Sequence, residues 1–406
     1  MSNSRDARNP IPYYRLTYMF RFLLASLNIE AILQESTIYR RRERLSKITD
    51  GLRLEDIYGT TIERIMAQRG DKPRLGMGTL MWITYAERLL EVNELCHALG
   101  IELGSEDFNP DNIPSISTLV SCCQGLITVD KGASNARLIH FTLTEYFSAH
   151  PNIFSRPHSA MAEICLTYLN SQQVKTLLAD RSAQLYPNLR ALFHGKPLLG
   201  YCSLYWGVHV KREISDNSRS LALQLLQEYD GHISAQLLLS KEVSLRVGNS
   251  DSWSPFSGLH CASFLGIVEM VVVLIDTGCC DPNGEDFRGF TPLALAVREG
   301  HEEVVRILLG WKEVNPNKPD NAGREPLSYA AARGHEGVVK ILLGREEVDP
   351  NKPENYGRTP LSHAATRGHE RVVKILLGRQ EVDSDKPDNG GRAPLSYPAA
   401  GGREGW

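Results

Sequence analysis

A segment of 34 residues recurs through the C-terminal third of the chain. The stretches "GFTPLALAV" from Gly289, "GREPLSYAA" from Gly323 and "GRTPLSHAA" from Gly357 follow one another at this step. A looser copy, "FSGLHCASFLG", begins at Phe256, and "GRAPLSYPA" begins at Gly391. Self-similarity at a fixed period indicates a stacked array, in which each unit buries its apolar face only against its neighbours.

Each unit carries the signals of two short helices followed by a loop. Thr291 or Thr359 is placed to cap the first helix, and the next residue is a proline at the first helical position. Gly334 is placed to end that helix. The second helix, "EGVVKILL", is too apolar for a one-sided surface helix and is expected to be buried. The turn-rich stretch "NKPENYG" then fits a β-hairpin.

These units resemble the ankyrin repeat. The "TPL" triplet, the paired alanines, the "GH" dipeptide and the "VV…LL" helix match the pattern of that family, and His260 matches its TPLH histidine. The resemblance implies four units over residues 257–392, which form an α-solenoid. It also implies a non-catalytic function, the binding of a protein partner on the concave face of the solenoid.

Variable positions of the family supply the candidate partner-binding residues. Arginine recurs among them at each step, and arginine with aromatic residues is typical of interface hot spots. The alternative is that the arginines only form exposed pairs with Asp320, Glu354 and Asp388, worth at most about 1 kcal/mol each. The candidates are Phe287, Arg288, Phe290, Arg298, Asn321, Arg324, Arg333, Asn355, Tyr356, Arg358 and Arg367.

The last copy, "APLSYPAAGGREGW", predicts a poorly covered end of the array. Ala393 replaces the capping threonine. Pro398 falls inside the first helix, where proline costs about 3 kcal/mol or more. We therefore expect residues 393–406 to be a truncated, poorly ordered repeat. An apolar patch with Val373, Leu376 and Leu377 is then expected to be exposed, and it favours self-association.

Residues 1–250 are predicted to be mainly helical. Residues 1–15 are expected to be disordered and residues 16–72 to be helical. Residues 73–155 give three helices and then two strands, "GLITVD" and "NARLIHFTL", which is the order of a winged helix. Residues 156–250 are a helical connector. The expected fold class is therefore mostly α, with a helical and winged-helix region followed by an ankyrin-repeat α-solenoid.

The order of these motifs, from "FRFLLASLNIEAIL" through "LIHFTLTEYFSAHP" to "AEICLTYLN", resembles the region after the nucleotide-binding domain of fungal NACHT–ankyrin proteins. These proteins belong to the NLR-like STAND class of signalling NTPases. The resemblance implies an interaction module related to immune-type receptors. The alternative is a degenerate regulatory protein that acts with a separate NTPase chain.

One departure from this class concerns nucleotide binding. The chain has no G-x-x-x-x-G-K-[ST] loop, so it looks like a relative that begins where the NTPase domain ends. No cofactor is therefore expected. His140 in "LIHFTLTEY" corresponds to the MHD-type histidine that touches the phosphate of the bound nucleotide in this class. Without a phosphate to sense, we expect His140 to make local hydrogen bonds only.

Several function classes are disfavoured. The net charge is −3, and the candidate recognition helix "ISTLVSCCQG" contains no lysine or arginine, which argues against DNA binding. No G-x-S-x-G or H-E-x-x-H motif and no paired metal ligands are present, so no enzyme activity and no metal are expected. The chain shows no signal peptide and no apolar stretch of membrane-spanning length, so a cytoplasmic or nuclear location without membrane contact is expected.

The eight cysteines follow no C-x-x-C spacing, and two pairs, Cys122–Cys123 and Cys279–Cys280, are adjacent. Adjacent cysteines suit neither zinc sites nor ordinary disulfides. We therefore expect all eight to be reduced and buried.

Overall fold

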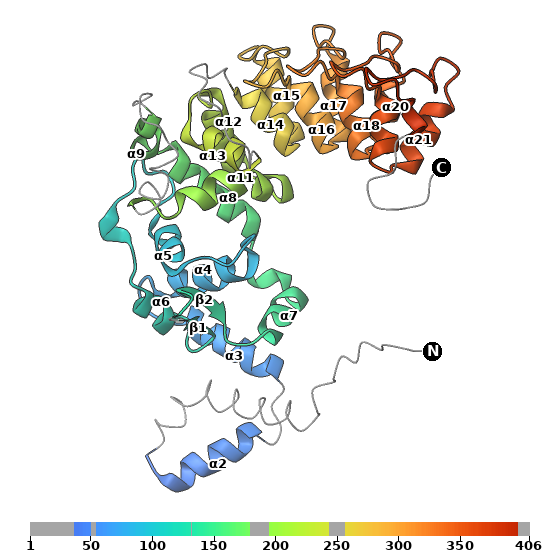
Figure 1. Ribbon diagram of the computed structural model, residues 1–406. Helices are drawn as coiled ribbons and strands as arrows, with labels where there is room; N and C mark the ends of the chain where they lie inside the picture. The colour runs from blue at the N-terminus through green and yellow to red at the C-terminus, as the bar shows by residue number, and fades with distance from the viewer. Residues whose placement is uncertain (1–35, 50–53, 131, 179–194, 243–255, 397–406) are drawn as a thin grey trace, which may run out of the picture. The chain divides into compact units, whose positions relative to one another are not determined.

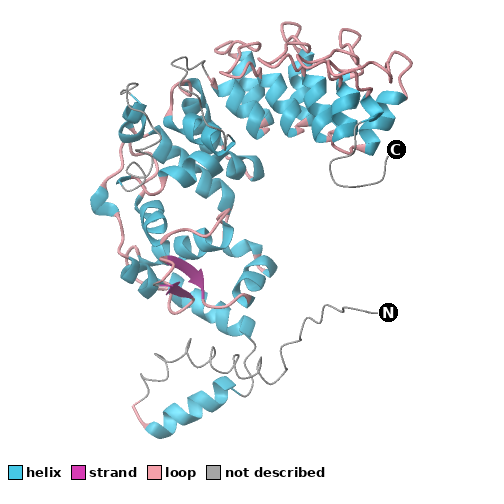
Figure 2. Ribbon diagram, viewed as in Figure 1, coloured by secondary structure: helices cyan, strands magenta, loops and turns pink. Residues whose placement is uncertain are grey.

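The computed structural model describes residues 36–49, 54–130, 132–178, 195–242 and 256–396. Contacts divide the chain into two units, residues 1–101 with 109–157, and residues 102–108 with 158–406. The described residues are mainly helical, with one two-stranded sheet (Figure 2). The expected disorder of residues 1–15 and the "FRFLLASLNIEAIL" helix lie outside the described residues.

The first unit contains the predicted three helices followed by a β-hairpin. Strand β1 pairs antiparallel with β2, so that Ile127 lies opposite Leu138. The elements are α2 (Ile38–Thr49), α3 (Leu54–Met66), α4 (Lys72–Tyr85), α5 (Val92–Gly100), η1 (Pro110–Asn112), α6 (Ile116–Cys122), β1 (Ile127–Asp130), β2 (Asn135–Leu138), α7 (Thr142–Ala149) and η2 (Pro151–Ile153).

One hydrophobic core joins these elements. Ile65 of α3, Leu80 of α4 and Phe147 of α7 are fully buried in it, together with Leu126 next to β1. Helix α3 therefore belongs to the same core as the winged-helix elements. The boundary predicted after residue 72 leaves α3 outside this core, because it rests only on the three helices nearest the hairpin.

The second unit begins with helices that lead directly into the repeats. Helix α11 packs against α13, and α12 packs against α14 and α15. The connector elements are α8 (Pro157–Asn170), α9 (Gln172–Lys175), η3 (Thr176–Leu178), α11 (Leu199–Arg212), α12 (Asp216–Gln227) and α13 (Ile233–Glu242).

The repeats form helix pairs whose first helices, α14, α16, α18 and α20, stack side by side (Figure 1). Thr291 and Thr359 cap α16 and α20 as predicted, accepting the backbone N–H groups of Ala294 and Ser362. The elements are α14 (Gly258–Leu265), α15 (Val268–Asp276), α16 (Pro292–Glu299), α17 (Glu302–Gly310), α18 (Pro326–Arg333), α19 (Glu336–Leu342), α20 (Pro360–Thr366), α21 (Glu370–Leu377) and η4 (Pro394–Ser396).

The loops between units are tight turns, and within the described residues they contain no β-strand. In one turn the N–H of Asp320 donates to the carbonyl oxygen of Arg324 at 3.0 Å. The same bond joins Glu354 to Arg358 in the next unit. The loops project from one edge of the stack (Figure 2). A second bond runs from the N–H of Gly323 to the carbonyl oxygen of Asp320 at 2.9 Å. The predicted β-hairpin is therefore replaced by a tight turn, because the prolines in these loops cannot donate to a ladder.

A histidine ladder, defined as His301, His335 and His369, couples consecutive units. The Nε2 atom of His369 lies 2.9 Å from the carbonyl oxygen of Ala332, which belongs to the preceding unit. Gly334, which ends α18 in the left-handed conformation at φ 76°, packs against the same ring. Equivalent bonds join His301 to Phe264 at 2.9 Å and His335 to Arg298 at 3.0 Å. Each unit therefore satisfies a helix-end carbonyl of its neighbour.

The last described residues are better covered than the sequence predicts. Val373 and Leu376 are buried, and Leu377 is 43% exposed. Pro394 is also buried, at the start of η4, which packs against α20. The expected apolar patch is therefore wrong for Val373 and Leu376, which are buried in a helix that packs against both α19 and α20. Residues 397–406 lie outside the described residues.

Candidate protein-binding face

Arg324 is held in place by a buried carboxylate and an aromatic ring. Its Nη2 and Nε atoms donate to Oδ2 of Asp320 at 2.9 and 3.2 Å. The guanidinium carbon lies 4.7 Å from the ring centroid of Tyr329, whose hydroxyl donates to Asp320. The Asp320 side chain is 3% exposed and the Arg324 side chain is 37% exposed. The Arg324 side chain is thus held by Asp320 and Tyr329 and remains partly exposed to solvent.

Positive charge converges on His363 in the next unit. Burial lowers the pKa of His363 to about 4, and the charges of Arg324, Arg358 and Arg367 contribute to this lowering. These three arginines come from two consecutive units and act on one imidazole, so they lie in the same region of the face. The nearest carboxylate, Glu354, has Oε1 3.8 Å from Nε2 of His363. Burial raises the pKa of Glu354. The neutral histidine leaves the region with an excess of positive charge.

Arg333 and Arg367 are exposed at the ends of the first helices. Arg333 lies 3.8 Å from a carboxylate oxygen of Glu299, with 45% of its side chain exposed. Tyr356 is 70% exposed on the turn between the second and third full units, close to Arg358 in sequence. A partner can contact these side chains without any rearrangement that exposes the core.

Two predicted contact residues, Phe290 and Arg298, are buried instead. The guanidinium carbon of Arg298 lies 5.8 Å from the ring centroid of Phe264 and 5.4 Å from that of Phe290. Its Nε atom donates to Glu299 at 2.7 Å. Both residues therefore pack between the first units, and they are left out of the candidate face.

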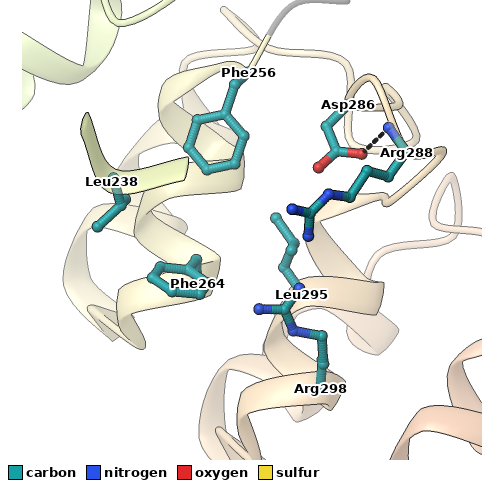
Figure 3. A pocket seen from close by; sticks show the side chains of 7 residues that line it. All are labelled: Leu238, Phe256, Phe264, Asp286, Arg288, Leu295 and Arg298. Atoms are coloured by element: carbon teal, nitrogen blue, oxygen red, sulfur yellow. Dashed lines mark hydrogen bonds between the residues drawn. The ribbon is translucent and has the colours of Figure 1, made fainter. Parts of the chain in front are cut away.

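Arg288 lines a small pocket at the start of the array (Figure 3), whereas Phe287 is not among the residues that line it. The guanidinium carbon of Arg288 lies 5.0 Å from the ring centroid of Phe287, and its backbone N–H donates to buried Asp286 at 2.8 Å. The enclosed space is only about 10 Å³, which holds roughly one water molecule at most and no ligand. It is lined by Leu238, Phe256, Phe264, Asp286, Arg288, Leu295 and Arg298.

Asn321 and Asn355 bridge neighbouring turns. Asn321 donates its backbone N–H to Arg288 at 3.0 Å and its side-chain amide to Phe287 at 3.1 Å. Asn355 donates its N–H to the carbonyl oxygen of Ala322 at 3.1 Å. Both side chains are exposed, but their bonds fix the spacing of the loops. Their first role is therefore structural.

The contact residues predicted from the sequence leave out the position just before the paired alanines. It is occupied by Leu295, Tyr329 and His363, which lie one step of 34 residues apart. Tyr329 contacts Arg324 and its partner Asp320, and His363 lies 3.8 Å from Glu354. The signal was available as the variable third letter of "LAL", "LSY" and "LSH", because this letter differs in every unit while the leucine two places before it and the alanine after it are kept.

In the first unit, His140 lies between β2 and α7. Its Nδ1 is 2.8 Å from the hydroxyl oxygen of Thr142, which is itself 2.8 Å from the hydroxyl of Tyr58. The ring centroid also lies 4.3 Å from that of Phe141. These are local hydrogen bonds at a strand-to-helix junction, as expected for this residue.

Comparison with known families assigns a domain to each unit. Residues 62–155 match the family described as GPI inositol-deacylase, winged helix domain. Overlapping segments, 223–320, 259–353, 310–388 and 327–405, match the family described as ankyrin repeats in three copies. The ankyrin match begins one repeat length earlier than predicted, and it includes the end of α12 and all of α13. No curated protein matches the chain.

No helix among the described residues is long and apolar enough to cross a membrane. The two family matches and the mostly helical structure agree on the order of the parts. The chain is built from a winged-helix domain at residues 62–155 followed by ankyrin repeats at residues 223–405.

Proposed function

We propose that the chain is a non-catalytic interaction module whose repeats bind an acidic protein segment. The binding surface is the arginine face, which we define as Arg324, Arg333, Arg358 and Arg367 with Tyr356. Stacked ankyrin repeats are a protein-interaction fold, which supports the general function. The observation that carries the choice of partner is the exposure of the Arg324, Arg333 and Arg367 side chains on consecutive units, while the carboxylate paired with Arg324 is buried.

The charge arrangement explains why an acidic partner is favoured. The carboxylates nearest these arginines, those of Asp320 and Glu354, are themselves buried. Arg324 is already ordered by Asp320 and Tyr329, so it loses little side-chain entropy on binding. Arginine can also pair with a carboxylate through two parallel hydrogen bonds. A partner with carboxylates spaced along an extended segment would fit arginines that recur from unit to unit.

The quadruple variant R324E/R333E/R358E/R367E tests the arginine face. We expect at least about a tenfold loss of partner capture by the full chain, with the difference shrinking as salt is raised, because screening weakens exposed charge pairs. Affinity capture followed by quantitative mass spectrometry measures the loss. The double variant R333E/R367E leaves the Arg324–Asp320 pair intact, so it reports on binding without altering a buried ion pair.

A matched control is R306E/K340E/R371E/K374E. These four residues are exposed on second helices, Arg306 in the preceding unit and the other three in the same units, and reversing them changes the net charge by the same amount. Partners lost from the arginine-face variants but retained by this control support the proposal. Equal retention by all variants, or equal loss from all, contradicts it.

We further propose that the module serves NLR-like signalling in the cytoplasm or nucleus, alone or with a separate NTPase chain. The order of a winged-helix domain followed by ankyrin repeats supports this reading. DNA binding by the winged helix is less well supported, because α6 contains no lysine or arginine. In this proposal the winged-helix domain makes contacts with protein.

Nucleotide binding separates the module from a complete NTPase. We expect the chain to show no binding heat with Mg-ATP or Mg-GTP and no hydrolysis, because its sequence has no phosphate-cradling loop. Isothermal titration calorimetry and a phosphate-release assay measure the two quantities, with nucleotide titrated into buffer as the control. A micromolar dissociation constant or turnover above the blank would show that the phosphate site has been missed.

A further inference from the structure

Cys279 and Cys280 follow helix α15 at a place where the other repeats have different residues. One step of 34 residues later, Glu313 and Val314 occupy these positions, and the glutamate and valine recur in the next two units. Val314 and Val348 are buried at this position, and Glu313 and Glu347 are exposed. The register therefore places one thiol at the edge of the core and one at the surface.

The structure differs here from the expectation that all cysteines are buried. Six of the eight are buried, but Cys279 is exposed and Cys280 is partly exposed. The two sulfurs lie 3.6 Å apart, and the hydroxyl of Thr277 lies 3.3 Å from Sγ of Cys279. Gly278 precedes the pair in the left-handed conformation at φ 62°. The 3.6 Å separation shows that both thiols lie on the same side of the chain.

The separation of the sulfurs suits a shared ligand atom better than a disulfide. Two sulfurs 3.6 Å apart, each at ~2.3 Å from one bound atom, subtend an angle of about 100° at that atom, which is near tetrahedral. A disulfide would require the sulfurs to approach to ~2.05 Å between adjacent residues, outside the usual disulfide geometry. The pair is thus arranged for chelation without rearrangement.

The residues around Cys279 and Cys280 favour a ligand that needs only two thiols. Among the described residues, no third His, Cys, Asp or Glu donor gathers with these two thiols. Structural zinc takes four protein ligands, whereas a monosubstituted trivalent arsenical takes two. Burial raises the pKa of Cys280 to about 11. A protonated thiol reacts slowly with peroxide, whereas the oxygen of an arsenical carries both thiol protons away as water.

We infer that Cys279 and Cys280 form a vicinal dithiol site for trivalent, thiophilic compounds of the arsenical class. With an organic arsenoxide, two As–S bonds form, the arsenic–oxygen bond is broken, and the oxygen leaves as water with the two thiol protons. Arsenic and sulfur keep their oxidation states, so no oxidant or reductant is needed. This inference is independent of the proposed binding function.

Phenylarsine oxide is the probe for this site. The reduced full chain is expected to take up one equivalent by native mass spectrometry. The adduct should resist 2-mercaptoethanol and be removed by 2,3-dimercaptopropanol, because only a dithiol competes with two-point attachment. Bound probe should also protect both cysteines from N-ethylmaleimide, as read by peptide mapping.

Each thiol can be replaced by the residue that occupies the equivalent position in the other repeats, so that the fold is kept. Cys279→Glu and Cys280→Val each install the residue of the neighbouring units, and each is expected to weaken retention at least about 100-fold, because chelation is lost. The double variant C279E/C280V keeps the other adjacent pair, Cys122–Cys123, in which both residues are buried. It therefore tests whether two adjacent cysteines are enough to retain the probe, or whether they must also be exposed.

Three outcomes overturn the inference. Wild-type chain that takes up no phenylarsine oxide has no such site. Equal retention by C279E/C280V places capture at other cysteines. Removal of the wild-type adduct by 2-mercaptoethanol alone shows attachment through a single thiol. Capture by the wild type, with loss in both single variants and in the double variant, supports it.

Discussion

Gly334→Ala is expected to lower the free energy of unfolding of the array by about 2–4 kcal/mol, from left-handed strain and a lost inter-unit hydrogen bond. Gly334 has φ 76°, a region that disfavours side chains other than hydrogen. A Cβ atom there would lie 2.6 Å from Nδ1 of His369. The ring cannot withdraw without giving up its bond to the carbonyl oxygen of Ala332.

Gly278→Ala is the matched control for this effect. Gly278 also has a positive φ, 62°, but no atom lies within 4 Å of the place that a Cβ atom would take there. It therefore carries the backbone strain without the collision. Guanidinium unfolding followed by circular dichroism measures both variants. If Gly334→Ala costs no more than Gly278→Ala, the histidine ladder does not couple the units as the structure indicates.

Acid is expected to destabilise the ankyrin-containing unit strongly between about pH 6.5 and pH 4. Burial lowers the pKa of His232, His260 and His363 to about 4 and that of His209 to about 3. In this window these histidines bind protons in the unfolded chain but stay neutral in the folded chain. The free energy of unfolding therefore falls as pH falls. Each such histidine contributes up to about 1.4 kcal/mol per pH unit. Below about pH 4, His232, His260 and His363 protonate in the folded chain as well, and the loss levels off once His209 follows near pH 3.

Buried carboxyl groups oppose part of this loss. Burial raises the pKa of Asp286, Glu325 and Glu354, so the folded chain binds their protons more readily than the unfolded chain does. Their effect begins only as pH falls toward the range in which carboxyl groups titrate, near and below about pH 5. The steepest decline in stability is therefore expected between about pH 6.5 and pH 5.

His363→Leu tests one contributor without introducing a foreign residue, because Leu295 occupies the equivalent position in the first full unit. We expect the plot of unfolding free energy against pH to become shallower by about 1 kcal/mol per pH unit in this window. Tyr329→Leu, at the equivalent position between them, is the control, since tyrosine does not titrate there. An unchanged slope for His363→Leu would show that its imidazole is accessible to protons in the folded state.

The repeat step predicted most of the array because it fixes local chemistry at known positions. A threonine followed by proline marks a helix start, and Gly334 marks a helix end, whatever the rest of the chain does. The winged-helix order was readable for the same reason, since its helices and strands have distinct periodicities. Its boundary was not, because α3 joins the core through contacts that no local pattern reveals.

The candidate face was only partly predictable. Family position placed Arg298 and Phe290 on the surface, but in this chain Phe264 and the first units close over them. Burial depends on which side chains the adjacent unit supplies, and this cannot be read from one unit alone. The closeness of the Cys279 and Cys280 sulfurs was unpredictable for a related reason, because it depends on the rotamers that the two side chains adopt in the folded chain.

The histidine ladder has a consequence for how such an array changes in evolution. Every internal unit offers the same imidazole to the unit before it and the same helix-end carbonyl to the unit after it. A duplicated or deleted stretch of 34 residues would therefore rejoin equivalent partners. The near-identical stretches "RGHEGVVKILLGREEVD" and "RGHERVVKILLGRQEVD" are suitable substrates for unequal recombination. The length of the array can thus vary between lineages while every interface is preserved.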